Sequence, residues 1–289
     1  MWFVLAISAA IIWGFSELFF KKSTQTENNI LLFFWQYVLQ GILYILVYFV
    51  LGEGLLKNFR LELLFIILPI AFAFWASMFI YIKAISNSKL SIVSPIMSSS
   101  YILAVILGIA FLNEKVTYLQ TISIILILIS MVLLIRCKNI DKDSEVSNKK
   151  YVYGIILGLI YFIVVGISSF AEKAYLNFYV EPTEYIFYYG ILCLIMTTIM
   201  FFTIKNVKKD FMFRLPNIDT WKGIIYCNMA GVIYIYTLSM NNISLVEPIV
   251  SSYVVVTEIL AAFILKERVS LKQRIYIILI ILGVIMISL

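Results

Sequence analysis

Long apolar runs separated by short polar connectors make up nearly the whole chain. An α-helix rises 1.5 Å per residue, so about 20 apolar residues cross the hydrocarbon core of a bilayer. The pattern therefore predicts an all-α integral membrane protein with ten transmembrane helices, in the following runs: 2–20, 30–51, 61–85, 91–112, 117–136, 152–176, 184–204, 220–240, 247–265 and 273–288.

Composition supports the interpretation that the bilayer is the solvent of this chain. Of its 289 residues, 63% are hydrophobic and only 13% are charged, and the mean hydropathy is +1.02. A soluble domain is closer to half apolar. The first run lacks a basic segment and a cleavage site, so it is interpreted as a spanning helix and not as a signal peptide. The net charge of +6 resides in short connectors, which is typical of membrane topology and does not indicate nucleic-acid binding.

The second half of the chain repeats the first at a constant shift of 153 residues. The segment "YIKAISNSKLSIVSPIMSS" (81–99) aligns with "YIYTLSMNNISLVEPIVSS" (234–252), and the match continues without a gap into "LNEKVTYLQ" and "LKERVSLKQ". Proline, glutamate and glutamine coincide, which two unrelated apolar segments would not produce. The sequence thus predicts two repeats, 1–136 and 152–289, joined by a polar linker at 137–151.

Each repeat holds five predicted helices, and this odd number has a topological consequence. The second copy must enter the membrane from the opposite side, which gives two inverted five-helix repeats. Transporters built this way bind their substrates near the midplane, between the repeats.

The connector pattern Glu-basic-Val-x-x-x-Gln occurs in both repeats, starting at Glu114 and at Glu267. Together with the two five-helix repeats, it resembles the EamA-type family of the drug/metabolite transporter superfamily over essentially the whole chain. Members usually carry glycine before this glutamate, where Asn113 and Lys266 stand here. The resemblance implies solute transport without ATP, often export of amino acids or small metabolites, and it does not fix the substrate.

Lysine and arginine are distributed unevenly between the two sides of the predicted membrane protein. The connectors after the first, third, fifth, seventh and ninth helices carry most of the 22 basic residues, whereas the other side carries Lys57, Arg60 and Lys115. The positive-inside rule then predicts that both termini lie outside. The predicted location is the plasma membrane. The family resemblance implies the opposite, with both termini in the cytoplasm.

Glu258 lies near the centre of the ninth run, far from any connector. A charged acid at a helix centre costs about 2.5–3.5 kcal/mol on insertion scales, and such residues are functional candidates by default. Glu258 is therefore predicted to bind a substrate cation or a proton, with a neutralised helix–helix contact as the alternative. The first repeat has Val105 at the equivalent position, so this acid is not part of the shared framework.

Glu17 follows Trp13 by one helical turn in the first run. A carboxylate and an indole on one face suit an amine, because the acid supplies charge and the ring supplies a cation–π surface. Glu17 is the second candidate for substrate binding and proton coupling. Its alternative interpretation is an ion pair with Lys21 at i,i+4 spacing.

Two further acids receive structural interpretations. Glu172 precedes Lys173 near the end of the sixth run, so an interfacial position is favoured. Glu247 and Ser94 stand directly before Pro248 and Pro95, where an acid or a hydroxyl suits the first turn of a helix. Glu247 and Ser94 are predicted to be helix caps, with a gating role as the alternative.

Aromatic and amide side chains in the interior of the runs are predicted to surround a central cavity. The repeat pairs Trp75 with Asn228 and Tyr81 with Tyr234, and Trp35 and Tyr188 form a third set in the second and seventh runs. For any one of these residues, packing or a place in the interfacial aromatic belt is the alternative.

The chain offers no catalytic or cofactor chemistry. It contains no histidine, no glycine-rich nucleotide loop, no metal-ligand cluster and no nucleophile–base pair, and its three cysteines have no metal or redox spacing. The prediction is a secondary transporter, not an enzyme, that moves an amine, a quaternary ammonium compound or an amino acid by alternating access. Proton coupling is a hypothesis, and the expected partners are the substrate, lipids and protons, with the protein a monomer or weak dimer. The alternatives are a non-transporting accessory or structural subunit and a lipid-linked sugar flippase.

Overall fold

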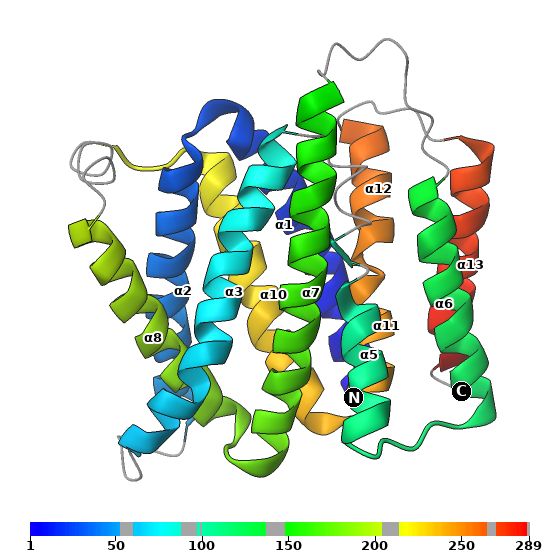
Figure 1. The fold of residues 1–289 in the computed structure, drawn as a ribbon, viewed down its shortest axis with the longest axis horizontal. Coiled ribbons are helices and arrows are strands. Elements are labelled where there is room, and N and C mark those ends of the chain that lie inside the picture. The colour runs from blue at the N-terminus through cyan, green and yellow to red at the C-terminus, as the bar shows by residue number, and fades with distance from the viewer. Residues whose placement is uncertain are drawn as a thin grey trace.

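The computed structural model describes residues 1–52, 60–87, 97–98, 100–136, 148–203, 214–264 and 270–287. Every regular element in these ranges is an α-helix (Figure 1): α1 Trp2–Thr26, α2 Asn29–Leu51, α3 Leu61–Asn87, α5 Ser100–Phe111, α6 Tyr118–Arg136, α7 Asn148–Phe178, α8 Pro182–Thr203, α10 Ile218–Met240, α11 Ile243–Ser251, α12 Tyr253–Ile264 and α13 Leu271–Ile287. Ser94, Pro95 and most of the predicted linker lie outside the described residues.

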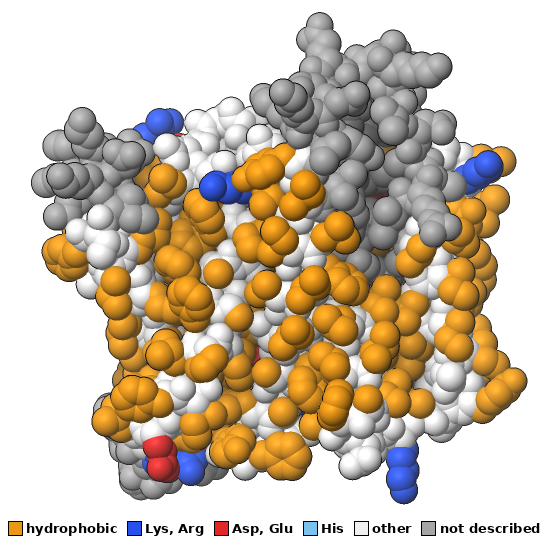
Figure 2. Space-filling model, viewed as in Figure 1, with side chains coloured by type: hydrophobic (Ala, Val, Ile, Leu, Met, Phe, Trp, Pro, Cys, Tyr) orange, Lys and Arg blue, Asp and Glu red, His pale blue; other side chains and the backbone are white. Residues whose placement is uncertain are grey.

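The predicted all-α membrane fold is confirmed, although not all ten spans reach membrane length in the described residues. Seven helical segments are long and apolar enough to cross a bilayer: α1, α2, α3, α8, α10, Ile156–Phe178 of α7, and the combined α11–α12. The apolar parts of α5, α6 and α13 are shorter. Hydrophobic side chains cover the flank of the molecule, and charged side chains lie near its edges (Figure 2). The chain is therefore a multi-pass membrane protein.

The helices of the two halves pack crosswise. Helix α1 packs along α10 and α3 packs along α7, while α2 packs on α8 and α6 on α13. Exchanging the two halves turns the pair α1–α10 into the pair α7–α3 and turns α2–α8 and α6–α13 into themselves. In Figure 1, α1 and α7 run in opposite directions, and both termini lie at the same edge. This arrangement is the one that an inverted repeat requires.

Glycines at equivalent positions allow the closest helix crossings. A Cβ added to Gly14 of α1 would lie 2.5 Å from the Cβ of Val256 in α12. A Cβ on Gly166 of α7 would lie 2.7 Å from the Cβ of Leu103 and 2.7 Å from the carbonyl oxygen of Ser100, both in α5. Val256 and Leu103 are related by the shift of 153 residues. Small residues at these points let α1 and α7 approach their partners closely, as in other membrane helix pairs.

Two lysines at equivalent positions cap the C-terminal ends of α3 and α10. Lys21 donates from Nζ to the carbonyl oxygen of Ile85 at 2.7 Å. Lys173 donates to the carbonyl oxygens of Leu238 and Asn241 at 2.6 and 2.7 Å. Ile85 and Leu238 are related by the same shift of 153 residues. These ammonium groups satisfy carbonyls that have no partner within their own helix.

The connector motif of the first repeat joins it to the second. The carboxylate of Glu114 accepts hydrogen bonds from the backbone N–H groups of Ile243 and Ser244 at 2.8 and 2.9 Å, which caps the start of α11. Because α11 begins at Ile243, Glu247 lies inside the helix. The prediction that Glu247 is a helix cap is therefore wrong.

The turn before α6 explains why Asn113 precedes the connector motif and why Gln120 ends it. Asn113 has a φ of 52°, a left-handed conformation that asparagine tolerates better than other residues with a side chain. Gln120 accepts from the Thr117 N–H at 2.9 Å, and its own N–H donates to the Thr117 hydroxyl at 3.3 Å. This reciprocal pair is a capping box.

The predicted helix 247–265 begins earlier than expected and is broken at Ser252. The N–H of Ser252 bonds to the carbonyl of Ile249, three residues back, at 3.1 Å, and not to that of Pro248, four residues back. The hydroxyl of Ser252 also donates to this carbonyl, at 2.6 Å. These tighter i→i−3 bonds separate α11 from α12.

Substituting Gly166 tests the close crossing of α7 and α5. Gly166→Ala should lower the free energy of unfolding by about 1–3 kcal/mol, because the new methyl group would collide with a backbone oxygen. Gly223→Ala is the matched control, since its Cβ would meet neighbouring atoms only at 3.3 Å. Unfolding in mixed micelles measures both variants. Equal stability of the two variants would contradict the crossing.

Candidate functional site

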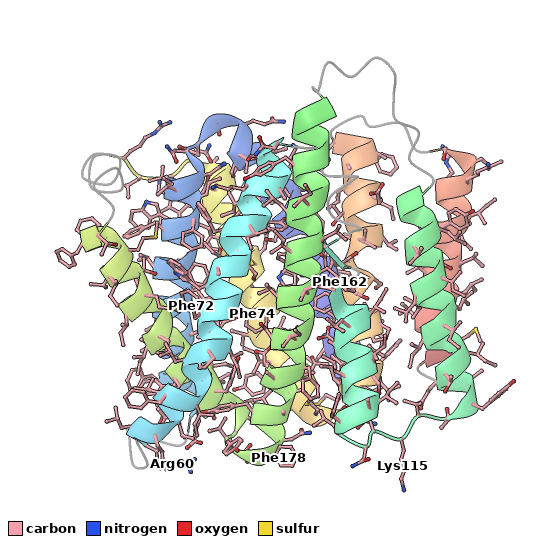
Figure 3. All side chains as sticks on the ribbon, viewed as in Figure 1. Arg60, Phe72, Phe74, Lys115, Phe162 and Phe178 are labelled. Atoms are coloured by element: carbon pink, nitrogen blue, oxygen red, sulfur yellow. The ribbon has the colours of Figure 1, made fainter. Side chains whose placement is uncertain are left out.

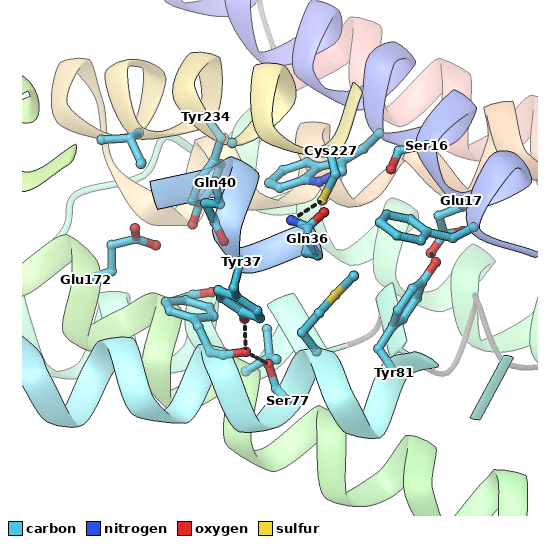
Figure 4. Close-up of a pocket in the computed structure, with 18 of the residues that line it drawn as sticks. Ser16, Glu17, Gln36, Tyr37, Gln40, Ser77, Tyr81, Glu172, Cys227 and Tyr234 are labelled. Atoms are coloured by element: carbon cyan, nitrogen blue, oxygen red, sulfur yellow. Dashed lines mark hydrogen bonds between the residues drawn. The ribbon is translucent and has the colours of Figure 1, made fainter. Parts of the chain in front are cut away.

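A cavity of about 160 Å³ lies among helices of both halves (Figure 4). Its lining comes from α1, α2, α3 and α5 of the first half and from α7, α8, α10 and α12 of the second. One water molecule needs about 10–15 Å³ of such space, so a small solute fits. The position between the halves agrees with the midplane sites of inverted-repeat transporters.

Carboxylates, hydroxyls and aromatic rings dominate the cavity wall. Glu17 and Glu172 both line it, and they are 5% and 4% exposed. None of the lining residues, all of which belong to the described ranges, is lysine or arginine. The tyrosines in the lining are Tyr37, Tyr44, Tyr81, Tyr101, Tyr161, Tyr189, Tyr234 and Tyr253. Such a wall attracts cations, because acids and the faces of aromatic rings both carry negative potential.

Glu17 connects the two halves at one end of the cavity. The hydroxyl of Tyr81 donates to its Oε1 at 3.4 Å, and the hydroxyl of Thr257 donates to its Oε2 at 3.0 Å. Tyr81 belongs to α3, whereas Thr257 belongs to α12 of the other half. Lys21, the alternative partner considered for Glu17, donates one hydrogen bond to the end of α3, and its ion pair with Glu17 stays a prediction. The Glu17 carboxylate is therefore positioned by hydroxyl groups from both halves.

A pair of amide side chains lies at the cavity wall. Asn228 donates to the carbonyl oxygen of Ile224 at 2.9 Å, and its own Oδ1 accepts from Nε2 of Gln36 at 3.2 Å. Gln36 lines the cavity, and its Oε1 has no hydrogen-bond partner among the described residues. Asn228 thus acts behind the wall by orienting Gln36.

Glu247 lies behind an aromatic part of the wall. It is 0% exposed, and its Oε1 accepts a hydrogen bond of 2.6 Å from the hydroxyl of Tyr234. The ring of Tyr234 packs against Trp13 at 5.4 Å between centroids, and Trp13 packs against Tyr253 at 6.5 Å. Glu247 therefore holds an aromatic residue of the cavity in place.

The cavity brings together four of the residues that the sequence singled out, namely Trp13, Glu17, Tyr81 and Tyr234. The other five lie outside its lining: Trp35, Trp75, Tyr188, Asn228 and Glu258. Glu258 is buried in α12, at 2% exposure, next to the Thr257 that binds Glu17. Its proposed contact with substrate or proton stays a prediction.

Three further candidates, Trp35, Trp75 and Tyr188, have contacts outside the cavity lining. Trp35 packs on Trp221 at 5.3 Å between ring centroids, and Trp75 packs on Phe33 at 4.8 Å. The hydroxyl of Tyr188 accepts from the backbone N–H of Arg60 at 2.8 Å, near the lower edge of the molecule. The contact of these residues with substrate stays a prediction.

Sequence reasoning missed Glu172, which it assigned to an interface because Lys173 follows. A shift of 152 residues aligns Gly14 with Gly166 and Lys21 with Lys173, and it also pairs Glu17 with Ser169 and Phe20 with Glu172. All four members of the latter two pairs line the cavity. This alignment of the first and sixth runs was the signal that would have identified Glu172.

A helical membrane protein with a cavity lined by acids, hydroxyls and aromatic rings between two crosswise-packed halves has the architecture of a membrane transporter. The model of the EamA-like transporter family matches residues 1–136 and again residues 152–289. The chain therefore belongs to this family, within the drug/metabolite transporter superfamily.

Comparisons with individual proteins support the fold of the chain and say nothing about its substrate. No curated protein matches the chain. A solved structure described only as "Crystal structure of protein" superposes with a TM-score of 0.71, covering 98% of this chain and 94% of the other at 14% sequence identity. The likeness at this identity concerns the arrangement of the helices.

Removing one hydroxyl tests the contact between Tyr234 and Glu247. Tyr234→Phe should lower the free energy of unfolding by about 1–3 kcal/mol, because a buried acceptor loses its donor. Tyr236→Phe, in the same helix, is the control, since the Tyr236 hydroxyl is buried without a hydrogen-bond partner among the described residues. Unfolding in mixed micelles compares the two. A loss in Tyr236→Phe as large as that in Tyr234→Phe would refute the assignment.

Proposed function

We propose that the protein is a secondary transporter that moves a small polar metabolite with a cationic amino group across the membrane by alternating access. The observation that carries this proposal is the pair of buried carboxylates, Glu17 and Glu172, in a cavity whose lining holds no lysine or arginine. An amine, a quaternary ammonium compound and an amino acid all present such a cation.

Substrate binding at Glu17 would bias the contact between the halves. An ammonium group that reaches this carboxylate competes with the hydroxyls of Tyr81 and Thr257, which belong to different halves. Trp13, one turn away, offers a ring face to the same cation. A ligand shifts a conformational equilibrium only through contacts that differ between the two states, and these hydrogen bonds are such contacts.

Proton coupling at Glu17 follows from the cost of a buried charge. A carboxylate within the membrane is neutralised by a proton or by a cation. Exchange of one for the other couples substrate movement to the proton gradient. Glu258 is the second coupling candidate, and its variant is tested beside that of Glu17.

Plasma-membrane location with both termini outside is also part of the proposal, and it rests on the distribution of lysine and arginine. Arg60 and Lys115 lie at the lower edge of the molecule in Figure 3, the edge of the two termini in Figure 1. Most other basic residues belong to connectors of the opposite side. The positive-inside rule assigns that richer side to the cytoplasm.

The two alternative functions receive less support from the site. A flippase for a lipid-linked sugar would need basic groups for a phosphate, and the lining of this cavity has none. An accessory subunit would not need an enclosed cavity with buried acids. Saturable transport distinguishes both alternatives from the proposed function.

Transport by proteoliposomes tests the proposal. Ethanolamine, choline and serine present the three cation classes on related skeletons, and a pH gradient should drive saturable uptake of at least one. Glu17→Gln should reduce this uptake by about tenfold or more, the effect of losing one charge-assisted contact. Glu184→Gln, which removes a carboxylate outside the cavity lining, should retain it.

Glu258→Gln separates the two coupling candidates in the same assay. A variant that keeps downhill exchange and loses pH-driven uptake identifies the coupling residue. Absence of uptake for all three solutes in the unmodified protein, or unchanged uptake in both the Glu17 and Glu258 variants, would overturn the proposed mechanism.

A further inference from the structure

Glu172 is an acid of the cavity wall that has no cationic partner among the described residues. Its side chain is 4% exposed, lines the cavity and lies at the left of Figure 4. Lys173, the next residue, donates to the carbonyl oxygens of Leu238 and Asn241 at 2.6 and 2.7 Å. Neither of the ion pairs formed within the described part of the chain involves Glu172. A negative charge on Glu172 would therefore stand without a lysine or arginine to balance it.

Uncharged hydroxyl groups and a second acid surround this carboxyl group. The hydroxyl of Tyr185 approaches it. Electrostatic interactions join it to four tyrosines, one each from α8, α2, α5 and α10: Tyr185, Tyr44, Tyr101 and Tyr234. Glu247 of α11 interacts with it in the same way. These neighbours offer hydrogen-bond donors and one like charge, and none of them offers a positive charge.

Helix α3, which packs along α7, adds no ion pair to Glu172. Its Tyr81 donates to Glu17, and its Glu62 is exposed at the start of the helix. The ammonium group of Lys83 lies over the ring of Phe79, at 4.5 Å from the ring centroid. The titratable groups of α3 thus lead to other partners.

Glu172 and Glu247 form a pair of buried acids that differ in their access to the cavity. Glu247 is 0% exposed, its Oε1 accepts from the Tyr234 hydroxyl at 2.6 Å, and its Oε2 has no hydrogen-bond partner in the described structure. Two interacting carboxylates inside a membrane repel each other, so such a pair holds at least one proton. Only Glu172 of the two lines the cavity, which has room for several water molecules. Water in the cavity can therefore exchange a proton with Glu172.

The packing of the helices does not require an acid at this position. Phe20 occupies the equivalent place in the first half, at the shift of 152 residues, and it is 1% exposed. An apolar side chain fills the site in one half, whereas the other half carries a costly carboxyl group. Acids inside membrane proteins commonly belong to proton pathways.

We propose that Glu172 binds and releases the proton that drives transport, while Glu17 binds the cation of the substrate. A hydronium ion in the cavity transfers its proton to the Glu172 carboxylate, which leaves water and a neutral acid. The reverse transfer, after the halves have changed their arrangement, releases the proton on the other side. This inference rests on the proposed amine transport and assigns its coupling proton to an acid other than Glu17 and Glu258.

Infrared difference spectroscopy tests the protonation directly and needs no substrate. The purified full-length protein in nanodiscs is compared with its Glu172→Gln variant at neutral pH, where a glutamic acid in water is ionised. The difference spectrum should contain the C=O stretch of a protonated carboxylic acid, and raising the pH should remove this band. Glu184→Gln, which changes a partly exposed carboxylate paired with Arg60, is the matched control and should give no such band. In Glu172→Asp the band should persist at a shifted frequency.

Proteoliposomes test whether this proton drives transport. The solute is whichever of ethanolamine, choline and serine shows saturable uptake. A gradient of one pH unit should raise its accumulation by up to about tenfold for one coupled proton. Glu172→Gln should hold this ratio near one, because an amide cannot exchange the proton, and Glu172→Asp should restore it. Glu17→Gln should lower uptake equally with and without the gradient, so that the ratio is kept.

The outcomes separate this inference from the proposed function. Absence of the carboxylic acid band would overturn the proton on Glu172, and a pH-driven ratio that survives Glu172→Gln would overturn its coupling role. Both results leave amine transport through the cavity intact. Saturable uptake of none of the three solutes would overturn the proposed function and the coupling role with it, while the infrared band still reports whether Glu172 holds a proton.

Discussion

Polar groups inside a membrane protein need partners, and this constraint governs where the buried acids, amides and lysines of this chain lie. Hydrocarbon offers no hydrogen bonds, so each such group must be satisfied by the protein, by water or by a ligand. Lys173 meets the last carbonyls of α10, and Glu114 meets the first N–H groups of α11. Gln36 Oε1 is one of several buried atoms that have no hydrogen-bond partner among the described residues, and Gln36 lines the cavity that also holds two acids.

Comparing the two repeats distinguishes residues that hold the helices together from residues that line the cavity. Residues that hold the helices together keep their identity in both halves, as Gly14 with Gly166 and Lys21 with Lys173 do. Residues that give the cavity its charge do not: Glu17 is replaced by Ser169 in the second half. The duplicated framework provides two similar halves, as the proposed alternating access requires, and the acids of the cavity differ between them.

The sequence was most informative about features that depend only on residues close together in the chain. A span needs only length and apolarity, so the runs were predictable. The run of α11 and α12 deviates because Ser252 bonds to the carbonyl three residues back. Trp13, Glu17, Tyr81 and Tyr234 were identified as site candidates, and all of them line the cavity.

Other residues could not be assigned from the sequence, because the rotation of each helix about its axis is set by its neighbours. Trp35 and Trp75 face other aromatic rings, and nothing in their local sequence reveals this direction. Glu172 was assigned to an interface because Lys173 follows it in the sequence. The ammonium group of Lys173 in fact binds α10. Two residues adjacent in a helix point in different directions, so a charged neighbour in the sequence is not necessarily a partner.

The central claim is that solute binds in the cavity between the halves, and protection of Cys227 tests it most directly. Cys227 lines the cavity, whereas Cys193 is a buried free thiol outside the lining, so each cysteine can be followed by peptide-resolved mass spectrometry after alkylation. A transported amine at about ten times its Kd should slow modification of Cys227 by about tenfold and leave Cys193 unchanged. Unaltered modification of Cys227 at saturating amine would contradict the account.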